Sequence, residues 1–197
     1  MRIVLSLIIL FSLSSCSLKP IEKKEISQYT IIEKNTSKPK VSNTINQKLT
    51  IYLLPTSANA PYNSKEIYYK TSPFKIEKYN YSKWIVSPSI LFNQILVEKL
   101  SLHEYVANEY NEINQSKFII STNIVQLLQD LTKENSKCTL SIRVKLVKPK
   151  SNILFKNKKF NSIIDCQPTI QGMIIATNIN SNIISNDISN WIEKNKQ

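Results

Sequence analysis

An unbroken alternation of apolar and polar residues near the middle of the chain constrains its fold most. In residues 139–146, with the sequence TLSIRVKL, every second side chain is apolar. Successive side chains of a strand point to opposite faces, so this pattern predicts one packed face and one face in water. Turn-forming residues at 132–137 and 149–152 separate this segment from its neighbours. We therefore predict three consecutive antiparallel strands between Phe118 and Ile164.

Two segments carry apolar residues at helical spacing. Ser87 and Pro88 suit the N-cap and the first position of a helix, and apolar residues recur every three or four positions from there to Ser101. A second helix is predicted from Pro168 to about Asn195. Its apolar stripe consists of Ile170, Met173, Ile174, Ala176, Ile179, Ile183, Ile184, Ile188, Trp191 and Ile192. Its β-branched and Asn residues lower helix propensity, so packing must hold it.

The remaining segments complete an α+β domain. Short strands are predicted at 29–32, 49–54, 66–70 and 74–79, with a polar linker at 33–47. We expect a mixed, largely antiparallel sheet packed against two main helices. This single domain, residues 48–197, would follow a lipidated and flexible N-terminus.

The first residues of the chain have the order of a secretory signal. Arg2 precedes an apolar run at 3–11, and small residues follow it. The run is shorter than the ~20 residues that span a bilayer. We therefore predict a signal peptide at residues 1–15.

A lipid anchor is expected at Cys16. Residues 13–16, LSSC, resemble the bacterial lipobox, in which the cysteine becomes the first mature residue and carries lipid. Each buried CH₂ contributes ~0.8 kcal/mol, so several acyl chains hold a protein stably on a membrane. Residues 16–47 would then form the anchor, a short strand and the linker. Ser17 after the cysteine favours the periplasmic face of the outer membrane over the inner membrane.

Two further cysteines have the spacing of a disulfide. Cys138 begins the middle strand of the predicted three, and Cys166 follows the last one. A hairpin that placed them opposite each other would turn near residue 152, within a residue or two of the turn signal at 149–152. In an exported chain this predicts a Cys138–Cys166 disulfide, stabilising by about 3–4 kcal/mol through loop closure. Two buried free thiols are the alternative.

Composition argues against catalysis. The chain has one Gly, Gly172, and one His, His103. Phosphate-binding loops need several glycines, and multi-His zinc sites are excluded. His103 lies beside Glu104, but neighbours in sequence rarely form a catalytic pair, so we expect a surface or helix-end residue. The sequence predicts no enzyme activity, no cofactor and no metal.

The net charge of +12 comes almost entirely from Lys, since Arg2 and Arg143 are the only arginines. Lys is less suited than Arg to bidentate recognition of phosphates or bases. We interpret the charge as a solvated basic surface. An exported chain of this kind is not expected to bind nucleic acid.

The aromatic residues between positions 61 and 88 follow an ordered pattern. Residues 61–70, PYNSKEIYYK, contain a Pro-Tyr loop and an Ile-x-Tyr strand; residues 79–88, YNYSKWIVSP, place an aromatic residue and a Trp directly before a helix. This order resembles the family of ABC-type transport auxiliary lipoproteins, and the resemblance spans Leu49 to Ile192. The signature positions are Tyr62, Tyr68, Tyr81 and Trp84. The chain departs from the family at 63–64 (Asn-Ser instead of Leu-Asp) and at 85–86 (Ile-Val instead of a small or acidic residue), which weakens any transfer of loop function.

The resemblance implies a non-catalytic, lipid-anchored periplasmic component of an ABC-type transporter. Such proteins accompany MCE-domain systems, including the paraquat-inducible type, that move phospholipid between the inner and outer membranes. The implied partners are an MCE-domain transporter protein, the membrane, and further copies of the chain in a homo-oligomeric ring. The signature aromatics would be core and loop-packing residues, or else interface residues. The alternative is an outer-membrane lipoprotein that acts as chaperone or plug in lipopolysaccharide or secretin assembly.

Overall fold

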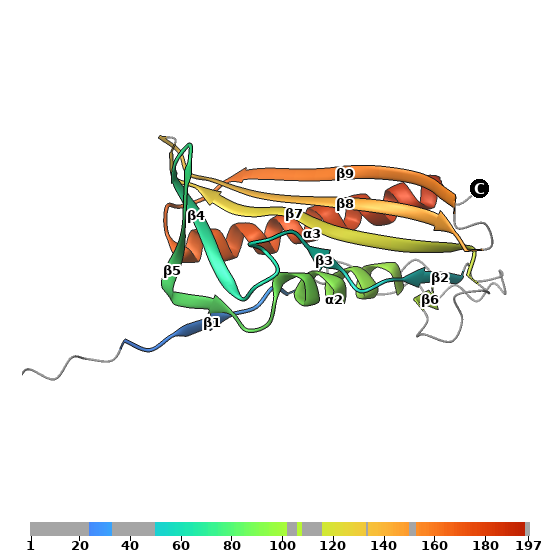
Figure 1. Cartoon of the computed structure of the whole chain (residues 1–197), viewed down its shortest axis with the longest axis horizontal. Coiled ribbons are helices and arrows are strands. Elements are labelled where there is room, and N and C mark those ends of the chain that lie inside the picture. The colour runs from blue at the N-terminus through green and yellow to red at the C-terminus, as the bar shows by residue number, and fades with distance from the viewer. Residues whose placement is uncertain are drawn as a thin grey trace, which may run out of the picture.

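Three long antiparallel strands form one side of the sheet, which confirms the prediction from alternation. The computed structural model describes residues 24–32, 50–101, 106–107, 116–132, 134–149 and 153–195. The long strands are β7 (Phe118–Asp130), β8 (Lys137–Lys148) and β9 (Ile153–Asp165). Ile142 of β8 lies between Ile124 of β7 and Phe160 of β9. These strands run nearly the length of the molecule (Figure 1).

Short strands extend the sheet beyond β7. They are β1 (Ser27–Tyr29), β2 (Thr50–Leu53), β3 (Ser57–Ala58), β4 (Glu66–Ser72), β5 (Lys75–Trp84) and β6 (Val106–Ala107). β2, β3 and β4 pair in parallel with successive parts of β7, while β5 is antiparallel to β4. β1 is parallel to β5, and β6 is parallel to β2. The sheet is therefore mixed, with antiparallel pairing in its long strands and parallel pairing in most of the short ones.

Two helices pack against the sheet, as predicted. α2 (Pro88–Ser101) contacts β3 and α3, and α3 (Ile170–Lys194) contacts β8 and β9. α3 runs lengthwise along the long strands (Figure 1). The Ser87 carbonyl accepts hydrogen bonds from the N–H groups of the first turn of α2, but its hydroxyl pairs with Ser89. None of the described helices is long and apolar enough to cross a bilayer.

The hydrophobic core lies between the helices and one face of the sheet. On β8, the apolar side chains of the alternating segment are buried, whereas Arg143 and Lys145 are exposed on the opposite face. Buried residues of α2 and α3 complete the core, and they include Leu91, Phe92, Ile95, Leu96, Ile184, Ile188 and Ile192. The structure thus has the α+β single-domain fold that the sequence predicts.

The helical stripe predicted on α3 is partly wrong. Ile179 and Ile183 are exposed, and the buried face holds small polar residues: Thr177, Asn180, Ser181, Ser185 and Ser189. Small side chains let the helix lie close to its neighbours, and the larger Asn180 is satisfied there. Its amide donates to the Cys138 carbonyl at 3.0 Å and accepts from the Ser162 hydroxyl at 2.6 Å. Isoleucine occurs on both sides of this helix, so hydrophobicity did not identify the packed side.

The bounds of two predicted strands also differ from expectation. The first strand covers Ser27–Tyr29 instead of 29–32, and β5 continues to Trp84 instead of ending at residue 79. The polar residues at the end of β5 were not predicted as part of a strand, but they pair with β1, with Ser82 opposite Ser27. The predicted signal peptide, Cys16, the linker at 33–47 and His103 lie outside the described residues.

Candidate functional site

The four signature aromatics do not share one surface. Trp84 is 1% exposed and Tyr62 is 8% exposed, so both belong to the core. The Tyr62 ring meets the half-buried Tyr68 ring edge to face, with centroids 6.2 Å apart. Burial raises the pKa of the Tyr62 phenol, and Tyr68 raises it further. These three aromatics pack the loop against the domain, and Tyr81 is the signature residue at the surface.

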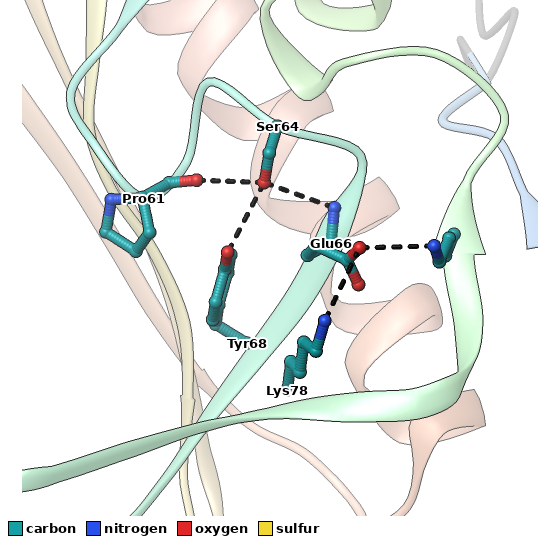
Figure 2. A network of polar contacts seen from close by, with 6 residues as sticks. Pro61, Ser64, Glu66, Tyr68 and Lys78 are labelled. Carbon is teal, nitrogen blue, oxygen red and sulfur yellow. Dashed lines mark hydrogen bonds and ion pairs between the residues drawn. The ribbon is translucent and has the colours of Figure 1, made fainter.

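A small polar network closes the loop that carries Tyr62 (Figure 2). The Ser64 hydroxyl donates to the Pro61 carbonyl at 3.0 Å, accepts from the Glu66 N–H at 3.3 Å and lies 3.4 Å from the Tyr68 hydroxyl. The Glu66 carboxylate pairs with Lys83 at 3.2 Å and with Lys78 at 3.7 Å. The network therefore joins the loop to both strands of the β4–β5 hairpin.

The first part of the same loop is fixed to β7 and α2. The Thr56 N–H donates to the Asn93 side-chain oxygen at 3.1 Å, and its hydroxyl lies 2.6 Å from that of Thr122. The Asn59 N–H donates to the Ile124 carbonyl at 2.9 Å. The loop is thus held at both ends and presents a defined surface.

Tyr81 lies beside the segment that would lead from the lipid anchor. Its side chain is 49% exposed, and the Lys24 ammonium lies 4.7 Å from its ring centroid, within the range of a cation–π contact. Its neighbour Ser82 pairs with Ser27 of β1. Tyr81 is thus the most exposed of the four signature residues.

The structure contains the Cys138–Cys166 disulfide that the hairpin spacing predicts, with the two Cα atoms 6.0 Å apart. The register differs slightly from the expected one, since Cys138 lies opposite Ile164. Cys166 follows the end of β9 and donates its N–H to the Ser136 carbonyl at 3.0 Å. The disulfide therefore ties the start of β8 to the connection between β9 and α3.

A buried glutamine beside the disulfide was not singled out from the sequence. Gln129 has no exposed surface; it accepts from the Tyr79 hydroxyl at 2.6 Å and donates to the Gln167 carbonyl at 2.7 Å. Burial, with Tyr69 as a lesser cause, raises the pKa of Tyr79 to about 12. A single Gln in a strand resembles any half-exposed polar residue, so no pattern in the sequence would have revealed it.

A hollow of about 810 Å³ between the N-terminal segment and α3 was also missed. Its walls include Tyr29 and Ile32 on one side and Ile175, Ile179 and Ile183 on the other. The sequence signal for it was present, because these three isoleucines recur at intervals of four. The sequence analysis assigned two of them to the core instead.

No group of three or more His, Cys, Asp or Glu side chains that could hold a metal ion occurs among the described residues.

No protein-family model matches the sequence, and a comparison with curated proteins finds no match. Among known structures, the crystal structure of protein XCC0632 from Xanthomonas campestris, described with the family model DUF330, aligns with a TM-score of 0.65. The two share 12% identity over 85% of this chain and 91% of that one. The chain has the fold of XCC0632. A second crystal structure, described as that of an uncharacterized protein, aligns with a TM-score of 0.67 at 12% identity, covering 85% of this chain and 99% of the other.

Proposed function

We propose that this chain is a non-catalytic, lipid-anchored periplasmic component of an MCE-associated ABC transporter that moves phospholipid between the inner and outer membranes. The protein would be held on the periplasmic face of the outer membrane by lipid on Cys16. Its domain would bind the MCE-domain protein, and several copies would form a ring around that contact.

One observation carries this proposal. A lipobox is followed by the ordered aromatic signature, and three of the four signature residues pack within the domain before α2. Tyr62 and Trp84 occupy the core, Tyr68 closes the loop, and Tyr81 remains at the surface. The fold shared with XCC0632 supports a common architecture over 85% of the chain.

Pull-down of the full-length acylated protein under mild detergent, with identification of the proteins that accompany it, tests the proposal. We expect an MCE-domain protein and an ABC ATPase. The variant Tyr81→Ala should lower recovery of the MCE-domain protein several-fold, since an exposed aromatic at an interface contributes strongly to binding. Ile90→Ala is the matched control, because Ile90 is 50% exposed and Tyr81 is 49% exposed.

Two results would overturn the proposal. Recovery of a large β-barrel without an MCE-domain protein would favour the chaperone or plug function in outer-membrane assembly. A Cys16→Ser variant that partitions into membranes as the native protein does would remove the lipid anchor on which the proposal depends.

A further inference from the structure

Three isoleucines on α3 are exposed to solvent, whereas other apolar residues of this helix are buried in the core. Ile175, Ile179 and Ile183 are 61%, 46% and 41% exposed. Residues four positions apart share one side of a helix, so the three side chains form a continuous row. Exposed apolar patches of this kind mark binding surfaces. This row forms one wall of the hollow described above. We call that hollow the isoleucine groove.

The opposite wall is hydrogen-bonded to α3. The Ile32 N–H donates to the Asn178 side-chain oxygen at 2.8 Å, and the Asn182 amide donates to the Ile32 carbonyl at 3.2 Å. A few residues earlier, Tyr29 pairs with Trp84 in the ladder between β1 and β5. These contacts attach the wall to α3, and the volume of about 810 Å³ is that of a small-molecule site.

The lining of the isoleucine groove selects the chemistry of its occupant. Its exposed surface is mostly apolar and comes largely from isoleucines, while the amides of Gln28, Asn178, Asn182 and Asn186 are among its polar groups and no charged side chain lines it among the described residues. A charged peptide or a nucleotide would lose its hydration there without a counter-charge. An aliphatic chain with a neutral polar ester end matches both parts of the lining.

The length of the groove agrees with one acyl chain. Ile174 and Asn186 both line it, and a helix rises about 1.5 Å per residue, so they lie about 18 Å apart along α3. The hydrocarbon core of a bilayer is about 30 Å thick and holds two chains end to end, so one chain extends about 15 Å. We propose that the isoleucine groove binds a single acyl chain of a membrane phospholipid.

The position of the groove gives it access to such a lipid. Lys24 follows Cys16 by eight positions, and an extended chain spans at most about 3.6 Å per residue, or about 29 Å in all. The groove begins at Gln28, just after this tether. This step rests on the lipid anchor of the proposed function, which would hold the groove close to the membrane surface.

Photo-cross-linking tests the inference on the full acylated protein. Vesicles of phosphatidylethanolamine and phosphatidylglycerol would include a phospholipid with a diazirine in its acyl chain, and cross-linked peptides would be mapped by mass spectrometry. We expect adducts on residues 28–32 and 174–186. Ile179→Asn should reduce these adducts several-fold. Ile163→Asn, on β9, should leave them unchanged and is matched in exposure, at 52% against 46%.

Three outcomes decide against the inference: adducts absent from both segments, adducts equal in the two variants, or loss of an oligomer of the protein in Ile179→Asn but not in Ile163→Asn. The last would identify a second copy as the occupant. Flotation of the same vesicles tests the anchor separately. Protein that floats without adducts overturns the groove alone, whereas protein that does not float overturns the anchor. In the latter case, adducts formed on α3 in mixed micelles of the same lipid would still support the groove.

Discussion

At the scale of single residues, the buried side chain of Gln129 joins several elements through hydrogen bonds, which an apolar side chain cannot form. It accepts from Tyr79 of β5, and it donates to Ser136 and to the carbonyl of Gln167 beside α3. We expect Gln129→Leu to lower the free energy of unfolding by about 1–3 kcal/mol, because it leaves buried partners unsatisfied. Urea denaturation would measure this loss. The exposed Gln94→Leu is the control, and equal stability of the two variants would contradict the prediction.

The buried phenol of Tyr79 makes the free energy of unfolding depend on pH in alkaline solution. Burial raises the pKa of its phenol from 10.0 to about 12 in the folded state. The unfolded chain releases the proton near pH 10, so deprotonation favours unfolding between about pH 10 and about pH 12. The stabilising contribution is complete below pH 10 and is lost as pH rises through this range.

We therefore expect the free energy of unfolding to fall with pH between about 10 and about 12, and to fall less steeply in Tyr79→Phe. Urea denaturation at a series of pH values measures the slope. Tyr81→Phe, at an exposed phenol, serves as the control. A slope in Tyr79→Phe equal to that of the native sequence would show that the buried phenol has no part in the effect.

At the scale of secondary-structure elements, the packing of α3 includes two unsatisfied hydroxyls. Ser181 and Ser189 are fully buried, and among the described residues their hydroxyl oxygens find no hydrogen-bond partner. Ser189→Ala should therefore raise the free energy of unfolding by about 0.5–1 kcal/mol, since Ala removes the desolvation cost and favours the helix. Thermal and urea denaturation would show the gain.

Ser185→Ala separates the two causes of that gain. Ser185 is equally buried, but its hydroxyl donates to the Asn182 carbonyl at 3.1 Å. Both variants gain helix propensity, whereas Ser185→Ala also loses a hydrogen bond. If Ser185→Ala stabilised the protein as much as Ser189→Ala, the unsatisfied hydroxyl would not be the cause.

The elements differ in how far the sequence could predict them. The alternation at 139–146 fixes both the strand and its packed face, because a one-residue shift would bury Arg143 and Lys145. For α3, the sequence predicted the helix but not the side of it that packs against the core. Isoleucine occupies two sides, and the packed side is chosen by Thr177, Asn180, Ser181, Ser185 and Ser189, whose small or paired side chains allow close approach. The isoleucine groove was missed for this reason.

At the scale of the whole molecule, contacts distant in sequence determine where the N-terminal segment lies. Ile32 is bonded to Asn178 and Asn182 of α3, and no local pattern around residue 32 indicates partners so far along the chain. The sequence analysis treated residues 16–47 as one stretch between the anchor and the domain. In the structure, residues 27–32 already lie on the domain through β1 and α3.

This attachment predicts how the tether sets the height of the domain above the membrane. If Cys16 carries the lipid of the proposed function, a Gly/Ser insertion between Cys16 and Lys24 lengthens the link between that lipid and the attached segment, so the protein layer should move away from the bilayer. The same insertion within residues 33–47 should leave the height unchanged, because Ile32 and Thr50, on either side of that stretch, are both held on the domain. Neutron reflectometry of the acylated protein on a supported bilayer measures the height. An increase with the second insertion equal to that with the first would mean that β1 detaches from β5 at the membrane.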